Sequence, residues 1–524
     1  MGAILVSHVS WRRPGGAELL NDVGFSVGNG DKVALVGANG VGKTTLLRLI
    51  SGESAPTAGT ISIDGRLGVM RQLVGMADDT MTVRDLMVSL APERLQRAAA
   101  HLAAAEARAT EEPMRYAAAL AEWGDAGGYD IEVFWDVCAT KTIDAPFHEI
   151  ADRPLRTFSG GEQKKLALEA LLRSDFDVLI LDEPDNFLDV PGKRWLEDEL
   201  RRTPKTVLFV SHDRELLAAT ATKVVTVEAN GAWTHGGGFA SYHEARQAHL
   251  ERREHDLAVY EIERKKLEEL VIEMRRRASF SETFAPRLKA AESRLRQFDE
   301  KNERPTTVRD QKIDMRLGGA RTGKRALAIK SLELHGLTDA FSAEIWYGER
   351  VAILGPNGAG KSHFLRALAG DDRVERTGTI RLGAGVVTGH FNQTHEHPEW
   401  FGKRLLDILH AKDVVRGPAM GMLRRYEMQG CAEQTFDTLS GGQQARFQIL
   451  LLELAGATML LLDEPTDNLD LISAEALEAG LGEFHGTVIA VTHDRWFLRG
   501  FDRFIEFRED CSVVDHLSRP AGWR

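Results

Sequence analysis

The sequence predicts an α/β fold made of two similar parallel-sheet units, each with a helical subdomain, joined by an antiparallel α-helical coiled-coil hairpin. Three observations predict it. A glycine-rich loop lies twice between an apolar, strand-like run and a helical run. Continuous apolar runs end twice in the same acidic pair, as the buried strands of a parallel sheet do. A long charged segment with apolar residues at heptad spacing separates the two copies.

The glycine-rich loops, Gly37–Thr44 and Gly355–Ser362, have the phosphate-loop (P-loop) pattern in its strand–loop–helix setting. In such a loop, backbone N–H groups surround the β-phosphate, the lysine reaches the β- and γ-phosphates, and the hydroxyl holds Mg²⁺. Two copies make any explanation other than nucleotide binding improbable. The predicted nucleotide-binding residues are Gly37, Asn39, Gly40, Gly42, Lys43, Thr44 and Thr45, and Gly355, Asn357, Gly358, Gly360, Lys361 and Ser362.

Composition and charge indicate a globular protein with a basic middle segment. No apolar run approaches the length of a membrane span, and no targeting segment precedes the first loop. The three cysteines lie far apart and fit neither a disulfide framework nor a zinc cluster, so we expect reduced thiols in a cytoplasmic protein. The net charge is −12, but Tyr242–Lys330 holds 22 basic and 16 acidic residues. A polyanion would therefore meet the middle of the chain.

The start of the first unit, Ile4–Val27, is expected to form short strands around a turn at Pro14–Gly16. Trp11 lies in this stretch. It either stacks on an adenine ring or is buried in the sheet, and the sequence leaves both interpretations open.

The first copy is longer than the second between Gln72 and Ser159. The offset between the copies falls from 321 to 281 residues across this stretch, so the first copy holds 40 extra residues. We place them within Ser89–Tyr129, where alanine-rich helical spacing interrupted at Glu111–Pro113 predicts two helices. An enlarged helical subdomain is favoured over a hairpin that projects toward a partner.

A Ser-Gly-Gly helix start at Ser159–Gly161 recurs at Ser440–Gly442 and offers a hydroxyl and free N–H groups to an anion. In each copy it precedes an apolar run that ends in an acidic pair, Asp182–Glu183 or Asp463–Glu464. Carboxylates at the end of a buried strand lie where α/β sheets place chemistry. The aspartate would hold Mg²⁺ through water, and the glutamate would accept a proton from the attacking water.

Two histidines, His212 and His493, follow further apolar runs and begin the same His-Asp-Arg sequence. A neutral histidine at a strand end can donate a hydrogen bond to a γ-phosphate oxygen. His390, His395 and His397 also cluster in sequence, but no further ligand completes a metal site there, and we interpret them as part of a polar loop.

The segment between the copies is predicted to form two helices paired by heptad seams. Its tip carries cations and two aromatic residues that we expect to be exposed. Cations suit RNA phosphates and aromatic rings stack on bases, whereas the alternative is a solvated helix end. The candidate RNA contacts are Arg275, Arg276, Arg277, Phe280, Phe284, Arg287 and Lys289.

Together, the P-loop, the Ser-Gly-Gly helix start, the Asp-Glu pair and the His-Asp-Arg sequence resemble an ATP-binding cassette (ABC) ATPase. Two cassettes joined by a charged helical hairpin, without a membrane segment, resemble the F subfamily (ABC-F), whose members act on the ribosome. The resemblance implies a first cassette at 1–240 with a helical insertion at about 89–129, and a hairpin linker at 241–325 with its tip at about 275–289. It implies a second cassette at 326–510 and a short tail at 511–524.

The resemblance also implies two composite ATP–Mg²⁺ sites, in which ATP binding closes the cassettes on each other and hydrolysis releases them. Glu183, Glu464, His212 and His493 would be catalytic. Site one would combine Lys43, Thr44, Gln72, Asp182, Glu183 and His212 with Ser440, Gly441, Gly442 and Gln443. Site two would combine Lys361, Ser362, Gln393, Asp463, Glu464 and His493 with Ser159, Gly160, Gly161 and Glu162. The implied metal ligands are Thr44, Gln72 and Asp182, and Ser362, Gln393 and Asp463.

Three departures from the family pattern stand out. Glu162 replaces the usual glutamine, as is common in the first cassette of this subfamily. Pro184–Asp189 and Pro465–Asp470 differ from the usual Pro-Thr-Asn-His-Leu-Asp, which puts the cross-talk between the sites in doubt but not ATP binding. His363 stands where threonine is usual, and the sequence offers no physical account of it.

The leading functional hypothesis is a monomeric ATPase that docks on the ribosome and uses its hairpin near tRNA. It would be either a translation factor or an antibiotic ribosome-protection factor, and the modest tip only weakly disfavours a deep reach into a drug site. An alternative is the ATPase subunit of an exporter that recruits a separate membrane protein, which leaves the hairpin unexplained. A nucleotide-gated clamp with little turnover is disfavoured by the presence of Glu183 and Glu464.

Overall fold

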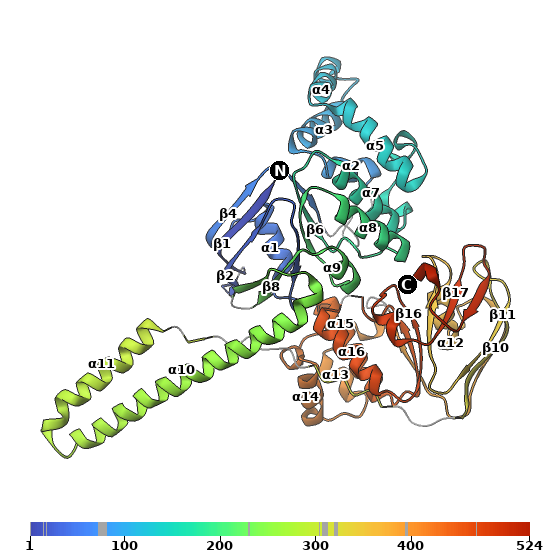
Figure 1. Ribbon diagram of the computed structural model, residues 1–524. Helices are drawn as coiled ribbons and strands as arrows, with labels where there is room; N and C mark the ends of the chain where they lie inside the picture. The colour runs from blue at the N-terminus through green and yellow to red at the C-terminus, as the bar shows by residue number, and fades with distance from the viewer. Residues whose placement is uncertain are drawn as a thin grey trace.

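The computed structural model describes residues 2–13, 15–16, 18–71, 81–228, 231–302, 304–305, 313–318, 323–392, 397–467 and 469–523. It consists of two α/β lobes and a helical hairpin that projects away from both of them (Figure 1). Each lobe has a mostly parallel six-stranded sheet and a three-stranded antiparallel sheet. The predicted fold class is confirmed.

The main sheet of the first lobe has the strand order β5-β6-β7-β3-β8-β9, and only the β8–β9 pair is antiparallel. Its central strands are buried along their whole length, as expected of continuous apolar runs. Its strands are β3 (Lys32–Val36), β5 (Leu67–Met70), β6 (Val178–Asp182), β7 (Thr206–Val210), β8 (Lys223–Glu228) and β9 (Gly231–His235). The antiparallel sheet comprises β1 (Ala3–Arg12), β2 (Glu18–Val27) and β4 (Ala58–Asp64).

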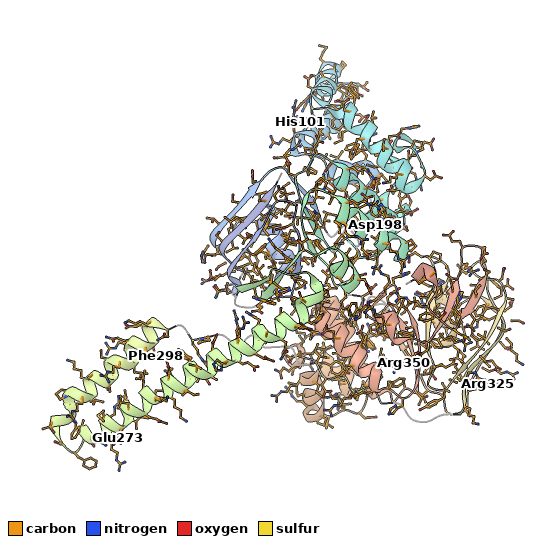
Figure 2. All side chains as sticks on the ribbon, in the orientation of Figure 1. His101, Asp198, Glu273, Phe298, Arg325 and Arg350 are labelled. Carbon is orange, nitrogen blue, oxygen red and sulfur yellow. The ribbon has the colours of Figure 1, made fainter. Side chains whose placement is uncertain are left out.

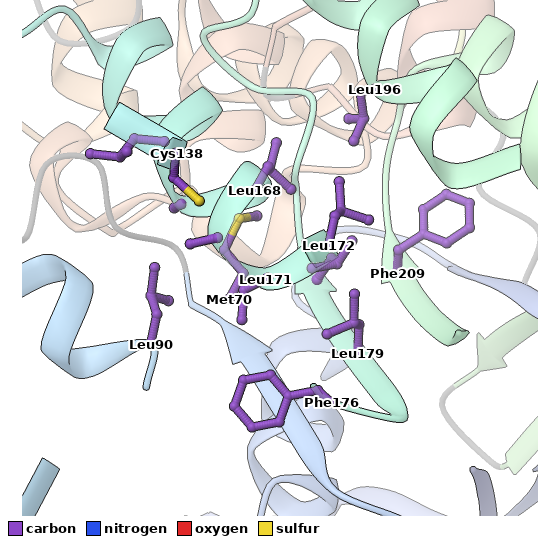
Figure 3. Packing of buried hydrophobic residues seen from close by; sticks show 14 of the residues in the cluster. Met70, Leu90, Cys138, Leu168, Leu171, Leu172, Phe176, Leu179, Leu196 and Phe209 are labelled. Atoms are coloured by element: carbon purple, nitrogen blue, oxygen red, sulfur yellow. The ribbon is translucent and has the colours of Figure 1, made fainter. Parts of the chain in front are cut away.

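Helices cover the main sheet and extend into a helical subdomain. Helix α1 (Lys43–Ile50) follows the P-loop. Figure 3 shows side chains of α7 (Gly160–Arg173) and β6 packed with Cys138, Phe176 and Phe209 in one apolar core. The other helices of this lobe are α2 (Val83–Ser89), α3 (Glu93–Glu106), α4 (Pro113–Asp125), α5 (Gly128–Ile143), α6 (Phe147–Ile150), α7 (Gly160–Arg173), α8 (Val190–Arg202) and α9 (Arg214–Thr220).

The stretch expected to hold the 40 extra residues contains α3 and α4, which lie at the far end of the first lobe (Figure 1). Pro113 is the first residue of α4, where its missing N–H removes no helical hydrogen bond. Trp123 on α4 packs on Trp135 of α5 with ring centroids 6.4 Å apart. The insertion is therefore joined to the core of the lobe by aromatic packing.

The second lobe repeats the arrangement with the strand order β14-β15-β16-β12-β17-β18, and β17 and β18 pair antiparallel. Its main strands are β12 (Arg350–Leu354), β14 (Thr388–Phe391), β15 (Met459–Asp463), β16 (Thr487–Val491), β17 (Arg503–Phe507) and β18 (Val513–His516). The antiparallel sheet comprises β10 (Arg325–Leu334), β11 (Phe341–Trp346) and β13 (Arg376–Leu382). Its helices are α12 (Lys361–Leu368), α13 (Leu405–His410), α14 (Arg416–Arg425), α15 (Gly441–Leu454) and α16 (Leu471–Glu483).

The hairpin consists of the long helix α10 (Tyr242–Ala278) and the shorter α11 (Ala285–Lys301), joined through the 3-10 turn Glu282–Phe284. Val271 and Ala291 are buried between the two helices, and Tyr260 packs on Phe298 at 5.2 Å. Figure 2 shows Phe298 on α11 and Glu273 near the far end of α10. The apolar seam and the Arg264–Asp299 ion pair at 3.0 Å hold the helices together.

The hairpin tip is less uniformly free than the sequence indicates. Phe280 is 82% exposed, but Phe284 is half-buried beneath the guanidinium of Arg287. Arg275 pairs with Glu292 across the hairpin at 2.9 Å, and Arg277 pairs with Glu273 one turn back along α10 at 2.7 Å. Within the part of the chain that the structure describes, Arg276 and Lys289 form no ion pair.

Candidate functional site

Both P-loops join a central strand of a main sheet to the helix that follows it. Gly37 has φ 151°, and a Cβ there would lie 2.6 Å from the carbonyl oxygen of Val227. Gly355 repeats this with φ 149° and a Cβ position 2.4 Å from the carbonyl oxygen of Phe507. Only glycine allows the loop backbone to pass this close to the neighbouring strand with a positive φ. Both loops can therefore bend toward the helix N-terminus, where anions bind.

The P-loop lysines are aimed into their own loops. The Nζ of Lys43 donates to the carbonyl oxygen of Gly37 at 2.7 Å, and the Nζ of Lys361 donates to the equivalent carbonyl of Gly355 at 2.7 Å. Burial lowers the pKa of both lysines, while neighbouring carboxylates oppose this shift. The two ammonium groups are thus held where the phosphates of a nucleotide would pass.

The candidate metal ligands bring a hydroxyl to a carboxylate at each site. The Oγ of Ser362 donates to the Oδ1 of Asp463 at 3.1 Å, and a hydrogen bond from Thr44 opposes the rise in the pKa of Asp182 that burial causes. This hard-oxygen donor set suits Mg²⁺, which takes few protein ligands and completes its shell with phosphate and water oxygens. The remaining implied ligands, Gln72 and Gln393, lie outside the described residues.

The two candidate catalytic glutamates lie at the ends of β6 and β15 in a left-handed backbone conformation, with φ 49° at Glu183 and 46° at Glu464. The N–H of each donates to the last residue of the neighbouring strand, Val210 or Val491, at 3.0 Å. These bonds stabilise a conformation that non-glycine residues rarely adopt. They fix the carboxylates at the carboxyl edge of each sheet.

Burial is the main cause of an elevated pKa at both glutamates. The pKa of Glu183 is raised to about 7, with Asp182 and Asp185 adding to the effect of burial. The pKa of Glu464 is raised to about 8, where Asp467 is the largest electrostatic contribution after burial. A carboxylate with a pKa near the working pH is well matched to accept a proton from water.

The surroundings of the two glutamates differ. The Nδ2 of Asn186 donates to Glu183 Oε2 at 2.6 Å, whereas Glu464 Oε2 accepts the backbone N–H of His493 at 3.0 Å. Lys164, which is 1% exposed, donates from Nζ to the backbone carbonyl of Glu183 at 2.9 Å. Ala445 occupies the position equivalent to Lys164 in the second copy, so Glu464 has no lysine at this position beside it.

Both histidines are held neutral. Burial and then the charge of Lys43 lower the pKa of His212 to about 3, and burial and Lys361 lower the pKa of His493 well below its usual value. Each ring can therefore donate one hydrogen bond. The ring of Trp523 stacks on that of His493 with centroids 6.0 Å apart. The sequence near the end of the chain gave no reason to expect this contact.

The Ser-Gly-Gly starts are helix caps as well as candidate anion-binding groups. Ser159 and Ser440 cap α7 and α15 in capping boxes that are completed by Glu162 and Gln443. Glu162 accepts the Ser159 N–H at 2.7 Å and Gln443 accepts the Ser440 N–H at 3.0 Å. Glutamate and glutamine serve equally as the third residue of a capping box, which gives a structural reason for the departure at Glu162.

A cavity of about 550 Å³ lies between the two lobes. Asn39 and Gly40 of the first P-loop and Ser440–Gly442 of the second lobe line it together, as the composite arrangement of site one requires. The other candidate catalytic residues and P-loop residues in its wall are Glu183, His212, Asn357, Gly358, Glu464 and His493. On the site-two side, a Cβ on Gly161 would lie 3.9 Å from Asn357.

Each P-loop also contacts the loop that follows the opposite glutamate. The Asn39 N–H donates to Asp470 Oδ2 at 2.9 Å, and Asn357 Nδ2 donates to the carbonyl oxygen of Phe187 at 3.2 Å. The same two loops carry the unusual sequences Pro184–Asp189 and Pro465–Asp470.

The repeated P-loop lobes match a known family. The family model described as "ABC transporter" matches residues 20–186 and 338–467, which together make up more than half of the chain. The chain belongs to the ABC transporter family. It is therefore a nucleotide-binding ATPase with two tandem ABC cassettes.

Full-length relatives place the chain in the ABC-F group. It is 49% identical to "Antibiotic resistance protein" of Mycobacteroides abscessus over 99% of both chains. It is 29% identical to "ABC transporter F family member 5" of Arabidopsis thaliana over 95% of this chain and 74% of that protein. It is also 29% identical to "Energy-dependent translational throttle protein EttA" of Escherichia coli over 94% of this chain and 90% of that one. None of the described helices is long and apolar enough to cross a membrane.

Two acidic departures of this ABC-F chain from the family pattern, Asp185 and Asp467, lie near one buried cation. Asp185 and Asp467 line the cavity between the cassettes together with Lys193 on α8. Lys193 pairs with Asp213 at 2.9 Å, and the fields of Asp213, Asp185 and Asp467 raise its pKa despite burial. The equivalent residue of the second copy is Ala474, so one lysine serves acidic residues from both cassettes.

We predict that ATPase activity rises with pH through the pKa values of the two glutamates. Each must be deprotonated to accept a proton, so kcat/KM for ATP should increase as pH increases. In Glu464→Gln the remaining rise should centre at about 7, and in Glu183→Gln at about 8. Steady-state ATPase measurements across this range check both values, and a flat profile between about pH 6 and 9 would contradict the assignment.

We predict that Lys193→Met destabilises the protein because it leaves several buried carboxylates without their cation. Removing one partner of a buried pair costs about 3–5 kcal/mol, so the apparent melting temperature should fall by several degrees. Adding Asp185→Asn and Asp467→Asn should recover part of the loss. Lys165→Met is the matched control, because its pair with Asp189 is long, at 3.8 Å, and partly exposed. An equal loss in Lys193→Met and in the control would count against the cluster.

Proposed function

We propose that this ABC-F ATPase docks on the ribosome in its ATP-bound, closed state and uses its hairpin near tRNA. The hairpin is the observation that carries the proposal. It extends from the region where the cassettes meet and away from both of them (Figure 1). Its length is about 55 Å along the 37 residues of α10, so it can reach a partner far from the ATP sites.

The base of the hairpin is placed to move when the cassettes close. Tyr242, the first residue of α10, is 2% exposed, stacks on Phe239 and hydrogen-bonds to Thr226 of β8 at 2.9 Å. Nδ1 of the next residue, His243, lies 3.5 Å from Oε1 of Glu475 on α16 of the second cassette. One helix end thus contacts both cassettes, and a change in their separation would tilt the hairpin.

The chemistry we assign to each site is hydrolysis of ATP to ADP and phosphate. Lys43 and Lys361 would bind the β- and γ-phosphates, and the hydroxyls of Thr44 and Ser362 would help hold Mg²⁺, which neutralises phosphate charge when bound. Glu183 and Glu464 would accept the proton of the attacking water. The neutral His212 and His493 would donate to γ-phosphate oxygens, and the opposite Ser-Gly-Gly helix start would complete each site.

The tip chemistry supports an RNA target. Phe280 presents a mostly exposed ring that can stack on a base, and Arg276, Arg287 and Lys289 are exposed cations beside it. Arg275 and Arg277 have their charges partly engaged within the hairpin, so they are expected to contribute less to RNA binding than Arg276.

Between the two ribosomal roles, an antibiotic-protection factor is favoured over a translation factor. The observation that favours it is the 49% identity over nearly the whole chain to a protein named for antibiotic resistance, against 29% to the translational throttle protein. We place the chain in the cytoplasm as a monomer whose own two cassettes form both ATP sites. The exporter-subunit alternative is disfavoured because it assigns no role to the hairpin and its cationic, aromatic tip.

We predict that Glu183→Gln with Glu464→Gln traps the protein on ribosomes. Both sites should still bind ATP but lose the group that accepts the water's proton, so the closed state should persist. The double variant should co-sediment with ribosomes in ATP and not in ADP, and its expression should stop growth. Absence of ribosome association in either nucleotide would contradict the proposal and favour the exporter subunit.

The contribution of the tip is predicted separately. Neutralising Arg275, Arg276 and Arg277 to glutamine in the trapped variant should weaken co-sedimentation and make the remainder less sensitive to salt, because fewer phosphates are neutralised. Arg294, Arg296 and Lys301, which are exposed on α11 away from the tip, provide a control with the same loss of charge. Equal effects of the two triple variants would show that net charge, and not the tip, determines binding.

A further inference from the structure

Two buried arginines cross the cassette interface in opposite directions. Arg214, the first residue of α9, donates to both carboxylate oxygens of Glu478 on α16, with Nη1 to Oε2 at 3.0 Å. Arg495 donates to both oxygens of Glu197 on α8, with Nη1 to Oε2 at 3.4 Å. Arg214 is 2% exposed and Arg495 is 5% exposed. Guanidinium groups this deeply buried depend on their carboxylate partners.

The two ion pairs are copies of each other under the internal repeat. Arg495 follows Arg214 by 281 residues and Glu478 follows Glu197 by 281 residues, the same offset that relates Glu464 to Glu183. Each pair takes its arginine from one copy and its glutamate from the other, so together they form a two-fold arrangement. Not every buried charge in this interface is repeated, because the position equivalent to Lys193 in the second copy is an alanine.

The arginines lie beside the groups expected to sense the γ-phosphate. Arg214 follows His212 by two residues, and Asp213 between them caps α9 through the N–H groups of Glu215 and Leu216. The loop is therefore short and tightly hydrogen-bonded. A shift of His212 on contact with phosphate would be passed directly to Arg214.

The helix that carries Glu478 also touches the P-loop of the first cassette through its capping residue. Helix α16 begins after Asp470, whose Oδ1 caps the helix through Ser473 and whose Oδ2 accepts the N–H of Asn39. The same helix therefore meets the first cassette at its P-loop and, two turns further along, at Arg214. Helix α8 has the matching sequence, with Asp189 as its cap and Glu197 two turns further along.

The arginines also link the two histidine loops. Arg214 Nη2 lies 3.5 Å from Asp494 Oδ2, which belongs to the His-Asp-Arg sequence of the second cassette. In the other direction across the interface, the charge of Asp213 in the first cassette contributes to the raised pKa of Arg495 in the second. Both loops thus share charge across the interface.

We propose that Arg214 and Arg495 are positioning residues that tie the histidine loop of each cassette to α16 or α8 of the other, so that γ-phosphate contact at one site tightens the whole interface. The proposal rests on ATP-driven closure, which is part of the proposed function. It assigns a role to the arginine of the His-Asp-Arg sequence. It also explains how one bound nucleotide can influence the second site.

The test measures closure without ribosomes. Spin labels at the exposed residues Arg202 on α8 and Glu483 on α16 report the distance between the cassettes during ATP titration of the Glu183→Gln, Glu464→Gln variant. Arg214→Met or Arg495→Met should raise the ATP concentration for half-closure at least about thirtyfold. The charge exchange Arg214→Glu with Glu478→Arg should restore closure to within about fivefold of the parent variant.

Arg499→Met is the matched control. It breaks the Arg499–Glu215 pair at 2.7 Å, which crosses the same interface but has an arginine that is 54% exposed. The expected change in half-closure is less than about fivefold. Wild-type ATP dependence in both single variants, or failure of the charge exchange to restore closure, would overturn the proposal. Normal ATP-driven closure without ribosome association would instead overturn the proposed function and leave the arginine pairs intact as a coupling device.

Discussion

The contact between each P-loop and the loop after the opposite glutamate is the constraint on which the site depends. Glu183 and Glu464 adopt a left-handed backbone conformation at a strand end, which is costly for a residue with a side chain. Hydrogen bonds to the adjacent strand hold this conformation, and the loop that follows is then directed across the interface to Asn39 or Asn357. Catalytic geometry and cassette association are therefore properties of one segment of chain.

The same segment makes the two sites unequal. Site one has the buried Lys164 beside Glu183, and its carboxylate is held by Asn186. At site two, Glu464 accepts the N–H of His493, whose ring is covered by Trp523. At both sites burial raises the pKa of the glutamate. The two sites thus hold their glutamates through different contacts.

Much of this structure could be predicted from sequence because its signals are local. The P-loops, the Ser-Gly-Gly helix starts and the buried strands are each specified within a few residues, and the heptad spacing predicted the two paired helices of the hairpin. Contacts such as Arg214–Glu478, 264 residues apart, have no local signal. One indirect signal existed, because an arginine and a glutamate recur at the repeat offset of 281 while Lys193 does not. Which residue pairs with such a repeated charge can be seen only in the folded interface.

The interface explains how two acidic departures can be tolerated in a motif that faces phosphate. Isolated carboxylates there would repel both the nucleotide and each other, and burial would increase the cost. Lys193 pairs with Asp213 and lines the same cavity as Asp185 and Asp467, so the added negative charge is balanced within the protein. Asp467 comes from the second cassette, so Lys193 balances its charge only while the cassettes are together. A charge cluster of this kind favours association of the cassettes.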